Sequence, residues 1–466
     1  MELFVRDKEF YKKAARIALP VTAQGLITIG INLTDTVMLG VFGEAQLSAS
    51  SLANQFYNIY QICCLGLGGG AAVLTAQFWG RKNMPAFRKT MTIMYRLCIL
   101  LAIGFTVATV LFPRQIMSIY SGEQAIIDNG VRYFQYLAWS YLFQGLAMTS
   151  TSVMRSCHIV HISLISSLCS FLMNIFGNWV LMFGKFGLPR MEIAGAALST
   201  LIARIFECLF IFGYIVVVDK RIGYRIRNLF EKCGDLFRDY MKYSMPVLVS
   251  DLLLALGNNA VAVVMGRIGS AFVSANAITM VVMQLSTIFN QGLSNASGVT
   301  IGNTLGAGEK EKAYRQGVTF FVLSFIVGIV AGLFILVLSP AIIGIYNITD
   351  ETKAIATQMM SALAIIVVFR SNSMVMTKGV LRGGGDTRFL MIADILFLWV
   401  LSVPLGVLTG LVWKAPAFLT YTALNIDHII KSFWCIKRLR SRKWMQVVQV
   451  GDSSESAELP KQETAS

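Results

Sequence analysis

One acidic residue inside the first long apolar block of the sequence gives the clearest indication of chemistry. Asn32, Thr28 and Gln24 lie three, seven and eleven residues before Asp35. In a helix these separations keep all four side chains within about 60° of one face. A carboxylate in an apolar environment is costly, so a retained one is a functional candidate by default. We therefore expect one wall of this helix to be polar and functional.

A second polar stripe occurs in the apolar block from about residue 160 to 184. Its members are spaced by three or four residues: Ser163, Ser167, Ser170, Asn174 and Asn178. Serines alone are ordinary packing residues in a membrane helix, but amides also supply the neutral oxygens that hard cations take as ligands. The stripe lacks a counter-charge, and Asp35 can supply it. The pattern predicts a site for H⁺ or Na⁺.

Further charges lie in apolar blocks. Arg204 and Glu207 share a helix face with Thr200, and their i,i+3 spacing predicts a structural ion pair. Arg370 stands alone in its block. Asp251 shares a face with Asn258 and is expected to point into a cleft from the second half of the chain.

Two remaining acids, Asp394 and Asp427, lie near the ends of their blocks. Asp427 stands four residues before Lys431, which predicts a solvated pair. Counted together, the blocks hold five acids against two bases, which favours cationic cargo over anionic cargo.

The elements that carry these residues must be membrane helices. Of 466 residues, 55% are hydrophobic and 14% are charged, and the mean hydropathy is +0.64, whereas a soluble domain has about 25% charged residues. Apolar blocks longer than about 20 residues exclude a β-barrel, whose strands alternate. The fold class is therefore all-α and polytopic. Twelve spans are expected at about 17–42, 47–79, 91–112, 131–154, 160–184, 193–218, 243–266, 272–304, 316–343, 354–377, 389–413 and 415–436.

The distribution of basic residues orients these spans. With the first residues inside, 31 of the 40 Lys and Arg fall on the cytoplasmic side, which predicts a cell (inner) membrane protein with both termini cytoplasmic. This rule also accounts for the net charge of +15, so the excess of basic residues does not indicate binding to nucleic acid. We expect residues 1–16 to form an interfacial lead-in and the Ser- and Glu-rich residues 441–466 to form a disordered cytoplasmic tail.

An internal repeat organises the spans. Six positions recur at one constant offset: Pro20, Asn32, Gly40, Gly43, Gly66 and Gly80 return as Pro246, Asn258, Gly266, Gly269, Gly292 and Gly306. At an offset longer by a single position, Pro113 and Arg155 return as Pro340 and Arg382. Each half has an even number of spans, so both enter the membrane in the same direction. We expect an N-terminal lobe (1–218), a cytoplasmic link (219–242) and a C-terminal lobe (243–440) around a central cleft.

The cleft is expected to be lined from both lobes. The expected lining residues are Gln24, Thr28, Asn32, Asp251 and Asn258, with the aromatics Tyr57, Phe171 and Phe289 if these face inward. The second lobe has Val261, Leu401 and Leu405 at the positions that repeat the polar cluster of the first. Ion coupling is therefore expected in the first lobe only.

The motifs together resemble the multidrug and toxic compound extrusion (MATE) family. They are DTVMLG (35–40), LGGGAAVLTAQFWG (67–80), SVMRSCH (152–158), LMNIFGNWVLMFGKFGLP (172–189), IAGAALSTLIAR (193–204) and LRGGGDTRF (381–389). The resemblance implies a cation or proton site formed by Asp35, Asn174, Asn178 and Thr200, with Asn178 where some members have Asp. It gives no matching site in the second lobe.

The resemblance implies a secondary antiporter that exports organic, often cationic, compounds in exchange for H⁺ or Na⁺. Its partners would be small-molecule substrates and the lipid bilayer, with no nucleic acid, no cofactor besides the coupling cation, and a monomeric state. We find no nucleotide-binding motif, no set of residues typical of nucleophilic catalysis and no metal-ligand cluster in the sequence, so an enzyme is not expected. The alternatives are a lipid-linked precursor flippase of the same superfamily and, as another class, a membrane scaffold or channel.

Overall fold

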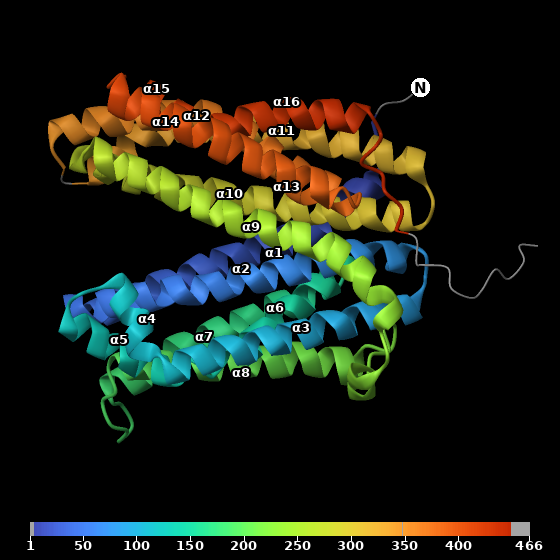
Figure 1. Cartoon of the computed structure of the whole chain (residues 1–466), viewed down its shortest axis with the longest axis horizontal. Coiled ribbons are helices and arrows are strands. Elements are labelled where there is room, and N and C mark those ends of the chain that lie inside the picture. Colours follow the sequence, from blue (N-terminus) through green and yellow to red (C-terminus); the bar gives the residue numbers. More distant parts are fainter. Residues whose placement is uncertain (1–3, 347, 449–466) are drawn as a thin grey trace, which may run out of the picture.

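The computed structural model describes residues 4–346 and 348–448, and this part of the chain is almost entirely helical (Figure 1). The first half contains α1 (Lys8–Gly40), α2 (Glu44–Gly80), α3 (Met84–Leu111), α4 (Pro113–Tyr120), α5 (Gln124–Leu137), α6 (Ser140–Ser156), α7 (His161–Phe183) and α8 (Ile193–Gly213). The second half contains α9 (Gly234–Ile268), α10 (Ser270–Gly306), α11 (Lys310–Ile345), α12 (Asp350–Met374), α13 (Thr387–Ile395), α14 (Val403–Val407), α15 (Ala417–Leu424) and α16 (Ile426–Arg440).

Ten helical segments in the described residues are long and apolar enough to cross a membrane. Several of them include π-helical turns, as where α12 continues through Val375–Leu381 and α13 continues toward α14 through Leu396–Ser402. The other two expected spans are each divided into two shorter helices. The fourth is α5 and α6, separated by Ala138 and Trp139, and the twelfth is α15 and α16, separated by Asn425.

The chain folds into two lobes. Helices α1–α8 form one group and α9–α16 form the other, and Figure 1 shows them as two stacked bundles. The lobes meet through two pairs of long helices, because α1 packs along α10 and α2 packs along both α9 and α10. The expected two-lobe, all-helical fold is confirmed.

Glycines related by the repeat show where the lobes are in contact. A methyl group on Gly66 would lie 2.7 Å from the Leu248 Cα, and one on Gly292 would lie 2.6 Å from the Ala18 carbonyl oxygen. Gly40 and Gly266 lie at the far ends of α1 and α9. A methyl group on either of them would meet nothing within 4 Å. The lobes are therefore tightly packed toward the end where α1 begins, and in Figure 1 the two pairs of helices diverge toward the opposite end.

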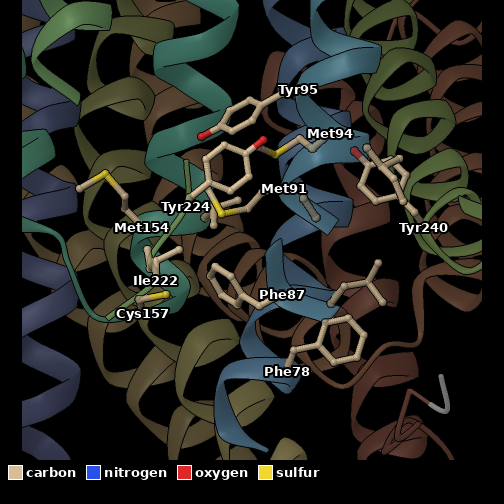
Figure 2. Close-up of a cluster of buried hydrophobic side chains, with 14 of the residues drawn as sticks. Phe78, Phe87, Met91, Met94, Tyr95, Met154, Cys157, Ile222, Tyr224 and Tyr240 are labelled. Atoms are coloured by element: carbon tan, nitrogen blue, oxygen red, sulfur yellow. The ribbon is translucent and has the colours of Figure 1, made fainter. Parts of the chain in front are cut away.

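The link between the lobes is anchored. Ile222 and Tyr224 are buried at 1% exposure and pack in a cluster with Phe87 and Tyr95 of α3 (Figure 2). The Tyr224 hydroxyl lies 3.2 Å from the Thr92 hydroxyl. Helix α9 begins at Gly234, so the helix takes up the last part of the link expected at 219–242.

The first residues pack against the second lobe. Phe10 of α1 contacts Phe320 of α11 with ring centroids 5.3 Å apart, and the Val5 amide donates to the Thr319 hydroxyl at 3.1 Å. Part of the expected N-terminal lobe, including much of the lead-in, is thus docked on the C-terminal lobe.

The prediction that the tail is disordered from residue 441 was wrong for its first part. Trp444 is fully buried and donates from Nε1 to the Leu439 carbonyl at 3.1 Å. The Val448 amide donates to the Gln77 Oε1 at 2.8 Å, which ties this segment to α2. Residues 449–466 lie outside the described residues.

Candidate functional site

The residues expected to hold an ion lie together in the first lobe. Asn178 of α7 donates from Nδ2 to the Asp35 Oδ1 of α1 at 2.5 Å and lies 3.4 Å from the Asn174 Oδ1. Asn174 in turn donates to the Thr200 hydroxyl of α8 at 3.4 Å. Three helices thus contribute one chain of polar contacts, and the i,i+4 spacing of Asn174 and Asn178 places both amides on the same face of α7.

Burial differs along this cluster. Asn178 is fully buried and Asn174 is 2% exposed, whereas Asp35 is half-buried. The Asn178 Oδ1 is buried without a hydrogen-bond partner in the described part of the chain. A carboxylate beside an unused amide oxygen is a donor set that a hard cation accepts.

Asp35, Asn174 and Thr200 border a cavity of about 520 Å³ in the first lobe. Its other polar lining residues include Asn54, Asn58 and Tyr133, which sequence reasoning missed. Asn54 and Asn58 lie four residues apart on one face of α2, a signal like the α7 stripe. Tyr133 carries no comparable signal.

The expected Arg204–Glu207 pair is present in α8. Arg204 Nη1 donates to the Glu207 Oε2 at 2.6 Å, and the two side chains are 17% and 12% exposed. Arg204 also lines the cavity that contains Asp35. The pair therefore lies at the border between the ion cluster and the centre of the molecule.

The expected cleft residues line two adjoining cavities. Gln24, Thr28 and Asn32 line one of about 500 Å³ that is also bordered by second-lobe helices. Asp251 and Asn258 line another of about 330 Å³ between the lobes. Thr28 and Asn32 also border the cavity of Asp35, so the ion cluster adjoins the central space.

The three aromatic residues behave differently. Tyr57 is buried and lines the cavity of Asp35. Phe171 packs against Gly30 instead, and Phe289 is 56% exposed. These aromatics were expected to line the cleft only if they face inward, and of the three only Tyr57 is among the residues that line the interior cavities in the described part of the chain.

The second lobe contains a buried charge cluster that the sequence pattern assigns to solvent. Lys431 is 3% exposed, and its Nζ lies 3.0 Å from the Asp394 Oδ1 and 3.1 Å from the Asp427 Oδ2. Ser402 donates to the Asp427 Oδ1 at 3.2 Å. The prediction of a solvated Asp427–Lys431 pair was wrong, because α13 brings Asp394 against α16 and the three charges are enclosed together.

Arg370 borders this cluster. It lines a cavity of about 200 Å³ with Lys431, and its Nη1 lies 3.1 Å from the His428 Nε2. Arg370 thus adds a further positive charge beside the three enclosed charges.

The charge balance of the cleft also differs from the sequence count. Around the four interior cavities stand six bases and five acids: Arg155, Arg204, Arg370, Lys378, Arg382 and Lys431, with Asp35, Glu207, Asp251, Asp394 and Asp427. Arg155, Lys378 and Arg382 lie just outside the expected spans, whereas Lys431 lies inside the expected span 415–436 and was left out of the count. Long Lys and Arg stems let a charge at a helix end reach inward, so the count of two bases was wrong.

Two lobes of membrane-spanning helices, with polar cavities within and between them, define a membrane transporter. The chain belongs to the MatE family, whose model matches residues 20–180 and residues 246–408. The two matched segments begin at Pro20 and Pro246, which are equivalent positions of the internal repeat.

Curated relatives and solved structures agree with this assignment. The chain is 27% identical to a "probable multidrug resistance protein NorM" of Mesorhizobium japonicum, covering 84% of this chain and 85% of that protein. It is 24% identical to a NorM protein of Thermotoga maritima, covering 94% and 93%, and 22% identical to the "uncharacterized transporter YisQ" of Bacillus subtilis, covering 88% and 90%.

The fold matches solved transporters at low sequence identity. A MATE structure in the bent conformation has a TM-score of 0.84 at 15% identity, covering 93% of this chain and 96% of that one. A Pyrococcus furiosus transporter, described by the reverse polarity of its binding pocket, has a TM-score of 0.82 at 17% identity, covering 93% and 96%.

Proposed function

We propose that the protein is a secondary antiporter that exports organic compounds in exchange for H⁺ or Na⁺ bound at Asp35. The observation that carries this proposal is the contact chain from Asp35 through Asn178 and Asn174 to Thr200, which borders a cavity adjoining the central cleft. Relatives named as probable multidrug resistance proteins support export as the activity.

The coupling step follows from the contacts of Asp35. A bound cation would replace the Asn178 amide hydrogen as the partner of the carboxylate, and the amide oxygens of Asn174 and Asn178 could then turn toward it. Because these groups belong to α1, α7 and α8, ion binding would change how the three helices pack. A ligand shifts a conformational equilibrium only by its different affinities for the two states.

The same site suits either coupling cation. A proton would neutralise Asp35, and Na⁺ would take the carboxylate, the amide oxygens and the Thr200 hydroxyl as ligands. In the second lobe Asp394 and Asp427 are already paired with Lys431, and Asp251 is paired with Lys378 and Arg382, which supports coupling in the first lobe.

Transport would proceed by rocking of the lobes between a conformation in which one end of the cleft is closed and a conformation in which the other end is closed. We place the closed end of the described structure in the cytoplasm, with both termini, because the basic residues concentrate there. With this orientation the cleft faces outward. The protein would be a multi-pass protein of the inner membrane and would act as a monomer. Labelling of a cysteine at exposed Lys220 should fail from outside intact cells; ready labelling would reverse the orientation.

The test of coupling is efflux from proteoliposomes under an imposed pH gradient and, separately, an imposed Na⁺ gradient. Asp35→Asn keeps the shape of the side chain and removes its charge, so it should abolish gradient-driven efflux in both arms. Asp350→Asn, at a fully exposed acid at the start of α12, is the matched control and should transport normally. Continued uphill transport by folded Asp35→Asn would refute the proposal.

A lipid-linked precursor flippase is the second candidate, and the observation that favours it is the number of basic residues around the cavities. The same liposomes distinguish the two. An antiporter moves soluble compounds only with a gradient, whereas a flippase would transfer a labelled lipid diphosphate across the bilayer.

A further inference from the structure

The cavity of about 330 Å³ between the lobes has an unusual set of charges. Three bases line it, Arg155 from the first lobe and Lys378 and Arg382 from the second, and Asp251 is its one acid among the described residues. Arg155 and Arg382 are equivalent positions of the internal repeat. Duplication has thus placed one arginine of each lobe at the same cavity.

The contacts of these bases leave positive charge uncompensated. Lys378 Nζ and Arg382 Nη2 both approach the Asp251 Oδ1, at 3.3 Å and 3.5 Å, so one carboxylate serves two cations. Arg155 contacts neutral amides instead, donating to the Gln24 Oε1 at 3.0 Å and the Asn295 Oδ1 at 3.2 Å. The lining therefore holds three cations against one anion, a net charge of +2.

Hydrogen-bonding capacity is also unused. The Nε atoms of Arg155 and Arg382 are buried, and neither has a hydrogen-bond partner among the residues that the structure describes. A buried donor without a partner is costly, and a guanidinium presents its donors in a fork that matches a carboxylate or phosphate. Both the surplus charge and the free donors would be satisfied by an anionic group.

The cavity has space for such a group and for a larger body attached to it. Gly69 faces Arg382, whose Nη1 would lie 3.3 Å from a methyl group at that position. Arg155 and Gln291 also line the neighbouring cavity of about 500 Å³, so the two spaces adjoin. An acidic group at the arginines could extend an organic body toward the centre of the molecule.

We propose that Arg155, Lys378 and Arg382 form a binding subsite for the acidic group, carboxylate or phosphate, of an organic cargo. The proposal rests on the export function proposed above and names its substrate class. It replaces the expectation of cationic cargo, which depended on the count of two bases. The subsite is separate from the Asp35 cluster, whose lining residues it does not share.

The test is equilibrium binding of carboxyfluorescein, an anionic dye, and ethidium, a cationic dye, to purified protein in phosphatidylcholine nanodiscs. Fluorescence anisotropy reports binding without any gradient. Arg155→Gln should weaken carboxyfluorescein binding about tenfold or more, which corresponds to about 1.4 kcal/mol, without weakening ethidium binding. Asp251→Asn removes the competing carboxylate and should tighten carboxyfluorescein binding. Arg132→Gln, at an exposed arginine of α5 outside the lining of this cavity, should change neither.

A purely structural role for Arg155 predicts a different result. If the arginine only joined the lobes, its loss would lower the melting temperature and affect both dyes alike. Lys378→Gln provides a second variant at a side chain that is 40% exposed, should Arg155→Gln not fold. Binding of ethidium alone, or unchanged carboxyfluorescein binding in both variants, would overturn the proposal.

The source of the acidic group is distinguished by lipid composition. Replacing phosphatidylcholine with phosphatidylglycerol should suppress dye binding if a lipid headgroup fills the subsite, and should leave it unchanged if a soluble anion does. Asp35→Asn should retain carboxyfluorescein binding, so a failure of ion coupling and a failure of the subsite give different results.

Discussion

Two glycines related by the repeat should control which end of the cleft is closed. Gly80, at the end of α2, and Gly306, at the end of α10, lie at one crossing between the lobes. A methyl group on Gly80 would overlap the Asn303 carbonyl oxygen and lie 2.9 Å from its carbon. One on Gly306 would overlap the Gln77 carbonyl oxygen and lie 2.8 Å from the Gln77 Cα. Either substitution by alanine must push the two helices apart.

The expected size of the effect follows from these contacts. The obstacles are backbone atoms, which cannot rotate away as a side chain could, and overpacking of this kind costs about 1–3 kcal/mol. The cost applies only while this end is closed. Gly80→Ala should therefore raise the ratio of the conformation open at this end to the closed one by roughly 5- to 150-fold. The double variant should have less than the summed effect, because one separation relieves both contacts.

The measurement is a distance distribution between spin labels at Lys82 and Glu309, which are exposed beyond α2 and α10. Labels on a background lacking the eight native cysteines should give a short distance in the parent protein. Both single variants should increase a longer population. Gly104→Ala is the matched control, because a methyl group there meets nothing within 4 Å. A population ratio unchanged within twofold in both folded variants would refute the reasoning.

Two stability predictions concern the second lobe. Lys431→Met leaves Asp394 and Asp427 enclosed without their shared cation, so it should destabilise the protein by about 3–5 kcal/mol. The measurement is the melting temperature in detergent, which should fall, and adding Asp427→Asn should recover part of the loss. A melting temperature of Lys431→Met equal to the parent's would contradict the buried cluster. Trp444→Ala removes a fully buried side chain and should cost about 3–5 kcal/mol, whereas Lys443→Ala beside it, at an exposed position, should have little effect on the same melting curve.

The sequence by itself determined the class of the protein, the number of spans and the duplication. These features depend on local or periodic signals: the length of apolar blocks, the placement of Lys and Arg, and identical residues at a constant offset. The ion cluster was also accessible, because Asn174 and Asn178 fall on one face of a single helix and a carboxylate in an apolar span has few alternative roles. Only the contact of Asp35 with that face required the fold.

Only the tertiary structure decided whether the charged side chains near the ends of spans point toward water or into the protein. Asp427 and Lys431 have the spacing of an exposed pair, and the approach of Asp394 from α13 makes them a buried one. Arg155 and Lys378 have the sequence positions of cytoplasmic charges, yet they reach the cavity between the lobes. A long side chain at a helix end can point to water or inward, and the neighbouring helix selects between these directions.

Which end of the cleft is closed, and where Trp444 docks, could likewise not be predicted from the sequence. Both depend on contacts between residues hundreds of positions apart, such as Gln77 with Val448 and Gly80 with Asn303. The repeat makes the two lobes alike in sequence, so it cannot specify how they are placed against each other. That placement is fixed by close backbone packing at a few small residues, which has no periodic signal along the chain.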